Sequence, residues 1–113
     1  MNLVRIKIEP GQEVIEKIHE ECALRGIRDA AIVSIIGAVD SCRIHNMKRD
    51  DPMAPVKNDY HEHFEMSGSG EITNGKAHIH CVMSREGEVT AAGHLHWARV
   101  EHWFVLVFIA PER

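Results

Sequence analysis

The fold of this chain is decided by residues 76–97, KAHIHCVMSREGEVTAAGHLHW, where two strand-like segments flank a turn that contains Gly87. Each segment carries the pattern His-x-His, and side chains two residues apart on a strand point to the same face. Four of the nine histidines of the chain therefore lie in one predicted β-hairpin, in two pairs that each share a face.

The length of the turn sets which histidines meet. If residues 85–87 form a three-residue loop with Gly87 in the left-handed region, His78 lies directly opposite His94. His80 is then a diagonal neighbour of His94, within about 7 to 8 Å, whereas His96 lies further out. A two-residue loop would place His94 on the other face, and the position of Gly87 favours the longer loop.

Three imidazoles that converge from adjacent strands make an open metal site, in which His78, His80 and His94 leave a fourth position free. Zinc is the default ion, although imidazole also suits iron, nickel and copper. The alternative is a solvated sheet face that happens to carry histidines. The small residues before His94 leave room and favour the metal, whereas Cys81 alternates out of phase with His80 and should point into the core.

The periodicity of the remaining sequence predicts an alternation of strands with one helix. We expect a strand over 3–9, a helix over 12–26 that follows Pro10-Gly11 and stops at Gly26, and a buried strand over 30–36 that bends at Gly37 and continues towards Ile44. The polar segment 46–60 contains two prolines and is predicted to be a loop. Further strands are expected within 61–72, 76–84, 88–100 and 102–110.

The composition is that of one soluble domain spanning residues 1–113, with 44% hydrophobic and 27% charged residues. The net charge of -4 and the scattered basic residues argue against nucleic-acid binding by this chain alone. Three widely spaced cysteines without a Cys-x-x-Cys pair fit a reducing cytoplasm. We find neither a signal segment nor an apolar run of membrane-spanning length, so no membrane association is expected.

Several motifs together resemble one family. They are the helix after Pro10-Gly11, SIIGAVDS at 34–41, SGEI at 69–72, HIH at 78–80 and GHL at 93–95. The combination resembles the plant and prokaryote conserved (PPC) domain over nearly the whole chain. The resemblance implies an α+β domain with a strongly bent antiparallel sheet packed against one main helix, assembled as a homotrimer. It also implies that His78, His80 and His94 are ligands of a metal, usually zinc, near a subunit interface.

The chain departs from that family at several positions. It carries no AT-hook of the kind that plant members use to hold DNA. His96 stands where an apolar residue is usual, and His61 and His63 precede the SGEI strand together with Glu62 and Glu65. Either glutamate is a candidate general acid or base, or a partner that orients a ligand imidazole.

The pairing of the strand 61–72 with the strand 76–84 decides between the two glutamates. A three-residue turn over 73–75 would set Gly70 opposite His78 and leave open space for a substrate above the sheet. The same register places Glu65 off the histidine face unless a bulge intervenes. Glu62 lies on the correct face without a bulge, and it is therefore the first choice.

The last strand-like segment, HWFVLVFIA, is apolar on both faces, which one helix cannot cover. We therefore expect an obligate oligomer, and the family resemblance makes it a trimer. Two functions remain open. The first is a metal-dependent enzyme of hydrolase or lyase type that acts on a small polar or carboxylated metabolite. The second is a non-catalytic, metal-containing module that binds a small ligand or regulates a partner.

Overall fold

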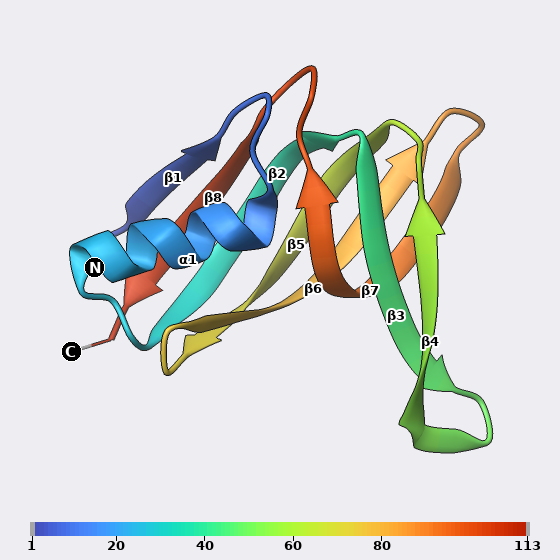
Figure 1. Cartoon of the computed structure of the whole chain (residues 1–113), viewed down its shortest axis with the longest axis horizontal. Coiled ribbons are helices and arrows are strands. Elements are labelled where there is room, and N and C mark those ends of the chain that lie inside the picture. Colours follow the sequence, from blue (N-terminus) through green and yellow to red (C-terminus); the bar gives the residue numbers. More distant parts are fainter. Residues whose placement is uncertain (1, 113) are drawn as a thin grey trace.

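The computed structural model describes residues 2–112 and combines one helix with an eight-stranded antiparallel sheet (Figure 1). The elements are β1 (Val4–Ile8), α1 (Val14–Arg25), β2 (Ala30–Val39), β3 (Ser41–Lys48), β4 (Asp51–Tyr60), β5 (Phe64–Thr73), β6 (Lys76–Arg85), β7 (Val89–Arg99) and β8 (Val105–Pro111). The strand order across the sheet is β1-β8-β2-β5-β6-β7-β3-β4. The predicted α+β class is confirmed. Within the described residues, no helix is long and apolar enough to span a membrane.

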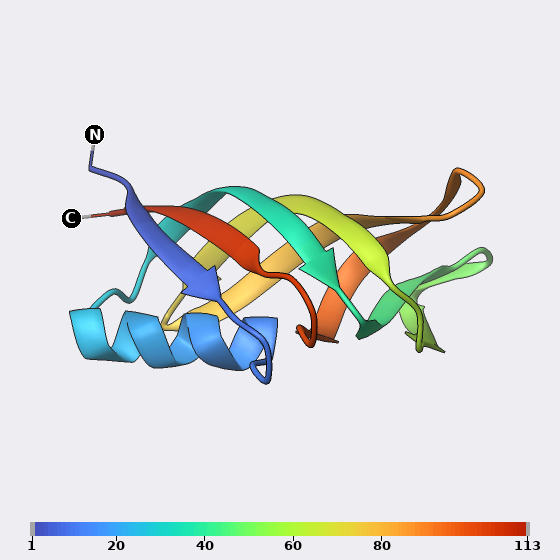
Figure 2. The ribbon, with the colours of Figure 1, turned by 90° about the horizontal axis from the view of Figure 1, so that it is seen from above.

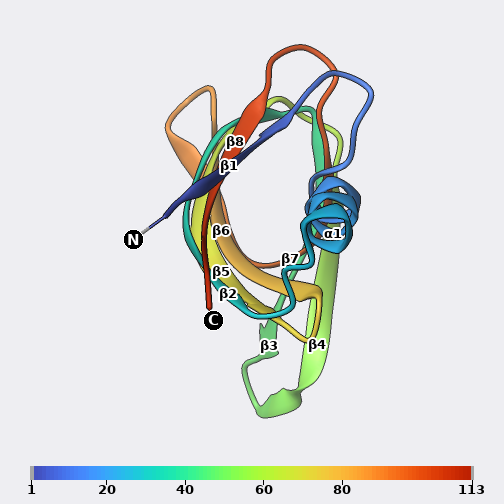
Figure 3. The same cartoon turned by 90° about the vertical axis from the view of Figure 1, so that its left-hand side faces the viewer.

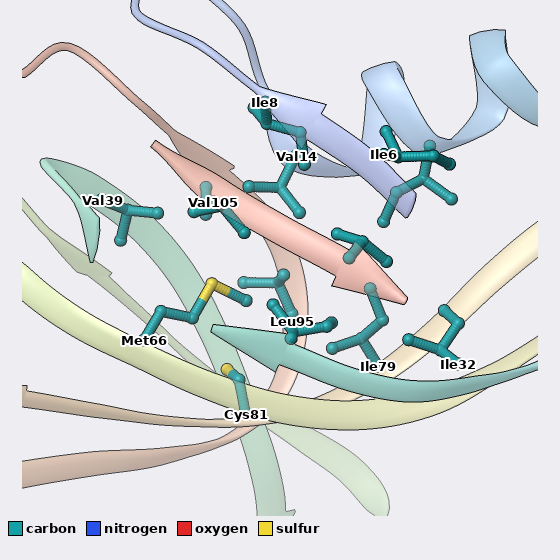
Figure 4. Close-up of a cluster of buried hydrophobic side chains, with 14 of the residues drawn as sticks. Ile6, Ile8, Val14, Ile32, Val39, Met66, Ile79, Cys81, Leu95 and Val105 are labelled. Atoms are coloured by element: carbon teal, nitrogen blue, oxygen red, sulfur yellow. The ribbon is translucent and has the colours of Figure 1, made fainter. Parts of the chain in front are cut away.

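The sheet bends strongly around a core that α1 closes. Strands β2, β5 and β6 curve around a central space, and α1 lies on the open side of the curve (Figures 2 and 3). The helix buries Val14, Ile18 and Cys22 on one stripe, as its sequence periodicity predicts. The core is built of apolar side chains from the helix and the sheet (Figure 4), and among the described residues no polar or charged side chain is buried.

Both ends of α1 are fixed by local contacts. The Glu13 carboxylate accepts hydrogen bonds from the backbone N–H groups of Ile15 (2.9 Å) and Glu16 (2.8 Å), so Glu13 caps the first turn. Its Oε2 also accepts from the Ala98 N–H (2.9 Å), which ties the start of the helix to β7. Gly26 adopts φ 68° and ends the helix, as predicted.

Glycines on the core face of β5 make the bend possible. A Cβ atom on Gly70 would lie 2.0 Å from the carbonyl oxygen of His78, and one on Gly68 would lie 2.6 Å from that of His80. Neither contact is tolerable, so β6 lies this close to β5 only because both residues lack a side chain. Gly68 and Gly70 alternate with the same phase as the buried residue Met66. Gly68 and Gly70 therefore lie on the core face of the sheet, whereas the side chains of His78 and His80 lie on the opposite face.

The predicted loop over 46–60 is wrong, because most of that segment is the hairpin of β3 and β4. β4 forms the outer edge of the sheet and pairs only with β3 (Figure 1). An edge strand tolerates Pro52 and Pro55 better than a central strand does, since only one of its sides is hydrogen-bonded to a neighbouring strand. Its mostly exposed side chains explain the polar sequence.

The predicted turn between β5 and β6 is also wrong by one residue. Asn74 (φ 54°) and Gly75 (φ 80°) form a two-residue turn with both residues at positive φ. A shift of one residue exchanges the faces of a strand. Glu71 and Ser69, and not the glycines, are therefore paired with His78 and His80.

The hairpin of β6 and β7 has a three-residue loop, as predicted, but the loop is displaced by one residue to 86–88. Gly87 (φ 86°) and Glu88 (φ 59°) both adopt left-handed conformations there. The pairing of β6 with β7 is displaced by two residues from the predicted register, and side chains two residues apart share a face, so the histidines keep their common face. His94 is paired with His80, however, and not with His78 as predicted.

Candidate metal centre

The alternation of β6 places its histidines on the outer face of the sheet. Ile79, Cys81 and Met83 are buried, whereas His78 and His80 between them are exposed. The prediction that Cys81 faces the core is thus confirmed. β7 presents His94 to the same outer face, directly beside His80.

The side chains of His78, His80 and His94 converge, and their nearest ring nitrogens all lie within 4.8 Å of one another. Their ring centroids are 4.8 Å apart for His78 and His94, 5.1 Å for His78 and His80, and 6.1 Å for His80 and His94. Zn–N bonds of about 2.0 to 2.1 Å in a tetrahedral site separate the nitrogens by about 3.3 Å. Three imidazole nitrogens that already lie within 4.8 Å of one another are a donor set that fits a zinc-like ion.

Two further histidines extend the cluster across β7 to β3. His45 is paired with His94 in the sheet, and their rings stack with centroids 4.2 Å apart and an interplanar angle of 12°. Nδ1 of His45 is hydrogen-bonded to Nε2 of His96. Sequence reasoning missed His45, because its neighbours depend on the pairing of β3 with β7, two segments far apart along the chain.

The environment keeps His94 in the form that binds metals. Burial, followed by the neighbouring histidines with His45 first among them, lowers the pKa of His94 to about 4. Burial and the nearby His45 also lower the pKa of His96. At neutral pH, His94 is therefore uncharged and has a free lone pair, as a metal ligand requires.

The carboxylate of Glu71 lies beside His78. Its Oε1 is 3.6 Å from Nδ1 of His78, to which Glu71 is paired across β5 and β6. A carboxylate at one ring nitrogen favours the tautomer that leaves the other nitrogen free for a metal. The Asn74-Gly75 turn was the signal in the sequence that could have identified Glu71.

The structure does not bring the two predicted glutamates to the cluster. Glu65 is paired with Ser84, four residues beyond His80 along β6, which corresponds to about 13 Å at the usual rise of a strand. Glu62 forms an ion pair with Arg85, one residue further away. The observed register places Glu65 on the same face as the histidines, so the reason for preferring Glu62 to Glu65 no longer holds.

Of the other histidines that the sequence left open, His96 joins the cluster through His45, as described above. His63 instead contacts Asp40, with 2.7 Å between its Nδ1 and the carboxylate. His61 is exposed and lies outside the cluster of possible metal ligands.

A groove of about 670 Å³ opens beside His80 and His94. Its walls include His80, His94, Ser69 and Asn46 together with apolar side chains. The Asn46 amide donates a hydrogen bond to the carbonyl oxygen of Ala92 (2.8 Å), which fixes one side of the groove. A concave, mostly apolar space with a few convergent polar groups is typical of small-molecule sites.

Comparison with known proteins identifies the type of domain. Residues 1–112 match the family model described as the Plants and Prokaryotes Conserved (PCC) domain. A metal-containing protein from Archaeoglobus fulgidus is 28% identical, with a TM-score of 0.77 over 99% of this chain and 82% of that one. A PPC protein from Pyrococcus horikoshii is 19% identical, with a TM-score of 0.84 over 100% of this chain and 80% of that one. None of the curated proteins compared with this chain matches it.

Two other solved structures bear on the predicted absence of nucleic-acid binding. Proteins from Bacteroides thetaiotaomicron (20% identical, TM-score 0.83, 99% of this chain and 80% of that one) and Ralstonia eutropha (18% identical, TM-score 0.83, 96% and 76%) carry names that propose DNA binding. At this identity the likeness shows the shared fold alone. The comparisons therefore do not support our exclusion of nucleic acid, which stays a prediction from charge.

Proposed function

The chain belongs to the Plants and Prokaryotes Conserved (PCC) domain family, and from this premise we propose that it is a cytoplasmic, homotrimeric metal-binding protein with one domain spanning residues 1–113. The observation that carries the proposal is the convergence of His78, His80 and His94 within 4.8 Å. The name of the Archaeoglobus fulgidus relative, which describes a metal-containing protein, supports it. The free and buried state of all three cysteines agrees with a reducing compartment.

Zinc is the metal that we propose, because three imidazoles with an open fourth position match its preferences. A bound zinc ion would supply Lewis acidity, which polarises a carbonyl group or lowers the pKa of water. The Glu71 carboxylate lies 3.6 Å from Nδ1 of His78, and the ring of His45 stacks on that of His94. These neighbours restrict the orientations of the two ligand rings.

The proposed activity is that of a hydrolase or lyase that acts on a small polar or carboxylated metabolite. The groove beside His80 and His94 is large enough for such a molecule, and Ser69 and Asn46 offer polar groups to it. A reaction of this type requires a proton acceptor near the ligand. We assign this role to His45, which lines the groove and is hydrogen-bonded to His96, because Glu62 and Glu65 lie further from the centre.

The alternative is a non-catalytic module that binds a small ligand or a regulatory partner. Glu65 and Glu62 contact the far end of β6, at Ser84 and Arg85, and this favours the module, since neither predicted catalytic carboxylate reaches the metal ligands within one chain. To separate the two functions, the zinc-loaded protein is incubated with a panel of small carboxylated metabolites. Consumption of one metabolite, lost in His94→Ala, supports the enzyme, whereas thermal stabilisation by a metabolite that stays unchanged supports the module.

The metal proposal itself is tested by comparing two histidine variants. His94→Ala should lose one ion per chain relative to the wild type when both are purified without chelator. His61→Ala is the matched control, because His61 is exposed and lies outside the cluster. Equal metal content in the wild type and in His94→Ala would refute the proposed site.

The trimer is proposed from the outer face of the sheet. Val33 and Ile36 of β2 are exposed there, and Leu106 and Phe108 of the adjacent β8 are only partly covered. An apolar surface formed by two neighbouring strands fits an interface between copies of the chain. One apolar face of β8 would then pack in the core and the other would be buried between subunits, which accounts for a last strand that is apolar on both faces.

A further inference from the structure

A second group of metal-type ligands lies outside the three-histidine cluster. Asp40 occupies the turn between β2 and β3, His63 directly precedes β5, and His102 lies between β7 and β8. The Oδ1 atom of Asp40 is 2.7 Å from Nδ1 of His63 and 2.8 Å from Nδ1 of His102. Side chains from three separate segments thus meet at one carboxylate.

The carboxylate at the centre of this group is held rigidly. Its second oxygen, Oδ2, accepts hydrogen bonds from the backbone N–H groups of Glu101 (2.6 Å) and His102 (3.2 Å). The Asp40 side chain is 12% exposed, whereas those of His63 and His102 are 80% and 67% exposed. Asp40 is therefore a fixed anchor, and the two imidazoles are open to solvent.

We propose that Asp40, His63 and His102 form a second site, which binds a divalent transition-metal ion through one carboxylate oxygen and two imidazole nitrogens. One candidate ligand atom from each residue lies within 4.8 Å of the others. Two histidines with one carboxylate are a donor set that proteins use for Zn²⁺ and Fe²⁺. In the metal-free protein, each Nδ1–H donates to Asp40. A ring that binds the ion carries its proton on Nε2, which leaves Nδ1 free to bond to the ion.

The surroundings of the second site attract a cation. It lies on the wall of a groove of about 950 Å³ that Trp103 and Phe104 also line. The described residues lining this groove carry four carboxylates, those of Asp40, Glu65, Glu86 and Glu88, and one guanidinium, that of Arg85. Arg85 is already paired with Glu62. The net negative charge raises the local concentration of cations.

The second site is independent of the three-histidine centre. It shares no residue with that centre, and its groove is lined by residues 84–88, at the opposite end of β6 from His78 and His80. Loss of one site should therefore leave the other intact. This independence also separates a failure of the present inference from a failure of the proposed function.

The test is a titration of the metal-stripped protein with Zn²⁺, followed by calorimetry, and with Co²⁺, followed by its absorption spectrum. We expect two sites per chain in the wild type, one in His102→Gln, one in His94→Ala and none in the double variant. His63→Gln and His102→Gln should each weaken the second site by at least about 100-fold, because loss of even an outer-shell partner costs 10–100-fold. His61→Ala, the matched control, should keep both sites.

Binding of the same number of ions by the wild type, His63→Gln and His102→Gln would overturn the inference and leave a hydrogen-bonded cluster only. Both substituted side chains are largely exposed, so these variants should fold. Asp40→Asn keeps the shape of the anchor and removes its charge. It should also lose the second site, and circular dichroism checks that the turn between β2 and β3 survives.

Discussion

His94 combines two properties that are seldom found together, since it is partly buried on the outer face of a sheet and surrounded by other histidines. Protonation there would place a positive charge in a poorly solvated position beside further imidazoles. In the unfolded chain, the same group would titrate near its ordinary pKa of 6.5. The difference makes the stability of the folded protein depend on pH.

The direction of that dependence follows from the lowered pKa. Between pH 6.5 and about 4, the unfolded chain binds a proton at His94 more readily than the folded protein does. The free energy of unfolding of the metal-stripped protein should therefore carry no penalty from His94 above pH 6.5. It should fall progressively as the pH falls towards 4. Urea unfolding at a series of pH values measures it. In His94→Gln the slope over this range should be smaller, and an identical slope would contradict our explanation.

Glu71 is predicted to position a metal ligand and not to support the fold. Glu71→Gln should weaken Zn²⁺ binding at the three-histidine centre by about 10–100-fold, because the His78 ring loses its charged partner. The free energy of unfolding should change by less than about 1 kcal/mol, since the contact is exposed. Glu65→Gln is the matched control on the same strand and face. Equal Zn²⁺ affinity in both variants would exclude the role of Glu71.

The sequence alone predicts the positions of some residues of the site and not of others. His78 and His80 follow from strand alternation within one short segment, and the nearby turn brings in His94. His45 and the partners of Asp40 meet only through pairings between segments far apart in the chain. Local periodicity contains no information about such pairings.

Among the structural elements, β5 carries two glycines that shape the site. β5 and β6 approach so closely that a single methyl group at Gly70 would collide with the backbone of His78. The Asn74-Gly75 turn sets which residues face each other across these strands. The bend and the register together fix the direction of the histidine side chains.

These two features predict different effects for the same kind of substitution. Gly70→Ala should destabilise the protein by about 2–4 kcal/mol and disturb metal binding, because the backbone of β6 must move away. Gly75→Ala meets no atom within 4 Å and should cost only about 1 kcal/mol for its positive φ. Denaturant unfolding of both variants provides the comparison. Similar losses would show that the close approach of β6 to β5 is not required.

The elements that local patterns define were predictable, and those that depend on their neighbours were not. β1 and α1 follow from clear periodicity and from Gly26 as the helix stop. β4 has two prolines and a polar sequence, and it is a strand only because β3 offers it a partner at the edge of the sheet. The turn after β5 was predicted one residue too long, and this error alone exchanged Glu71 for the glycines beside the histidines.

For the whole molecule, the bent sheet has a core face that α1 covers and an outer face that α1 does not reach. The outer face carries both the histidine cluster and the exposed apolar residues of β2. An oligomer that buried this face would lie close to the proposed metal centre. The family resemblance and the surface therefore agree on where subunits should meet.

Ile36 provides the test of that assembly, because it is 58% exposed in the single chain. In light scattering, the wild type should have about three times the chain mass of 12.8 kDa. Ile36→Glu should dissociate the trimer, since a charge is costly in an apolar interface, while the exposed position leaves the fold intact. A wild-type mass near 12.8 kDa at micromolar concentration would refute the trimer.

The most direct test of the metal centre is anomalous scattering from crystals of protein purified without chelator. Data recorded on either side of the zinc absorption edge locate any bound ion independently of its chemistry. We predict a peak at the centre of the His78, His80 and His94 imidazoles, at about 2.0 to 2.1 Å from one nitrogen of each ring. Its absence from these three rings, in crystals that had been supplied with zinc, would contradict the central claim.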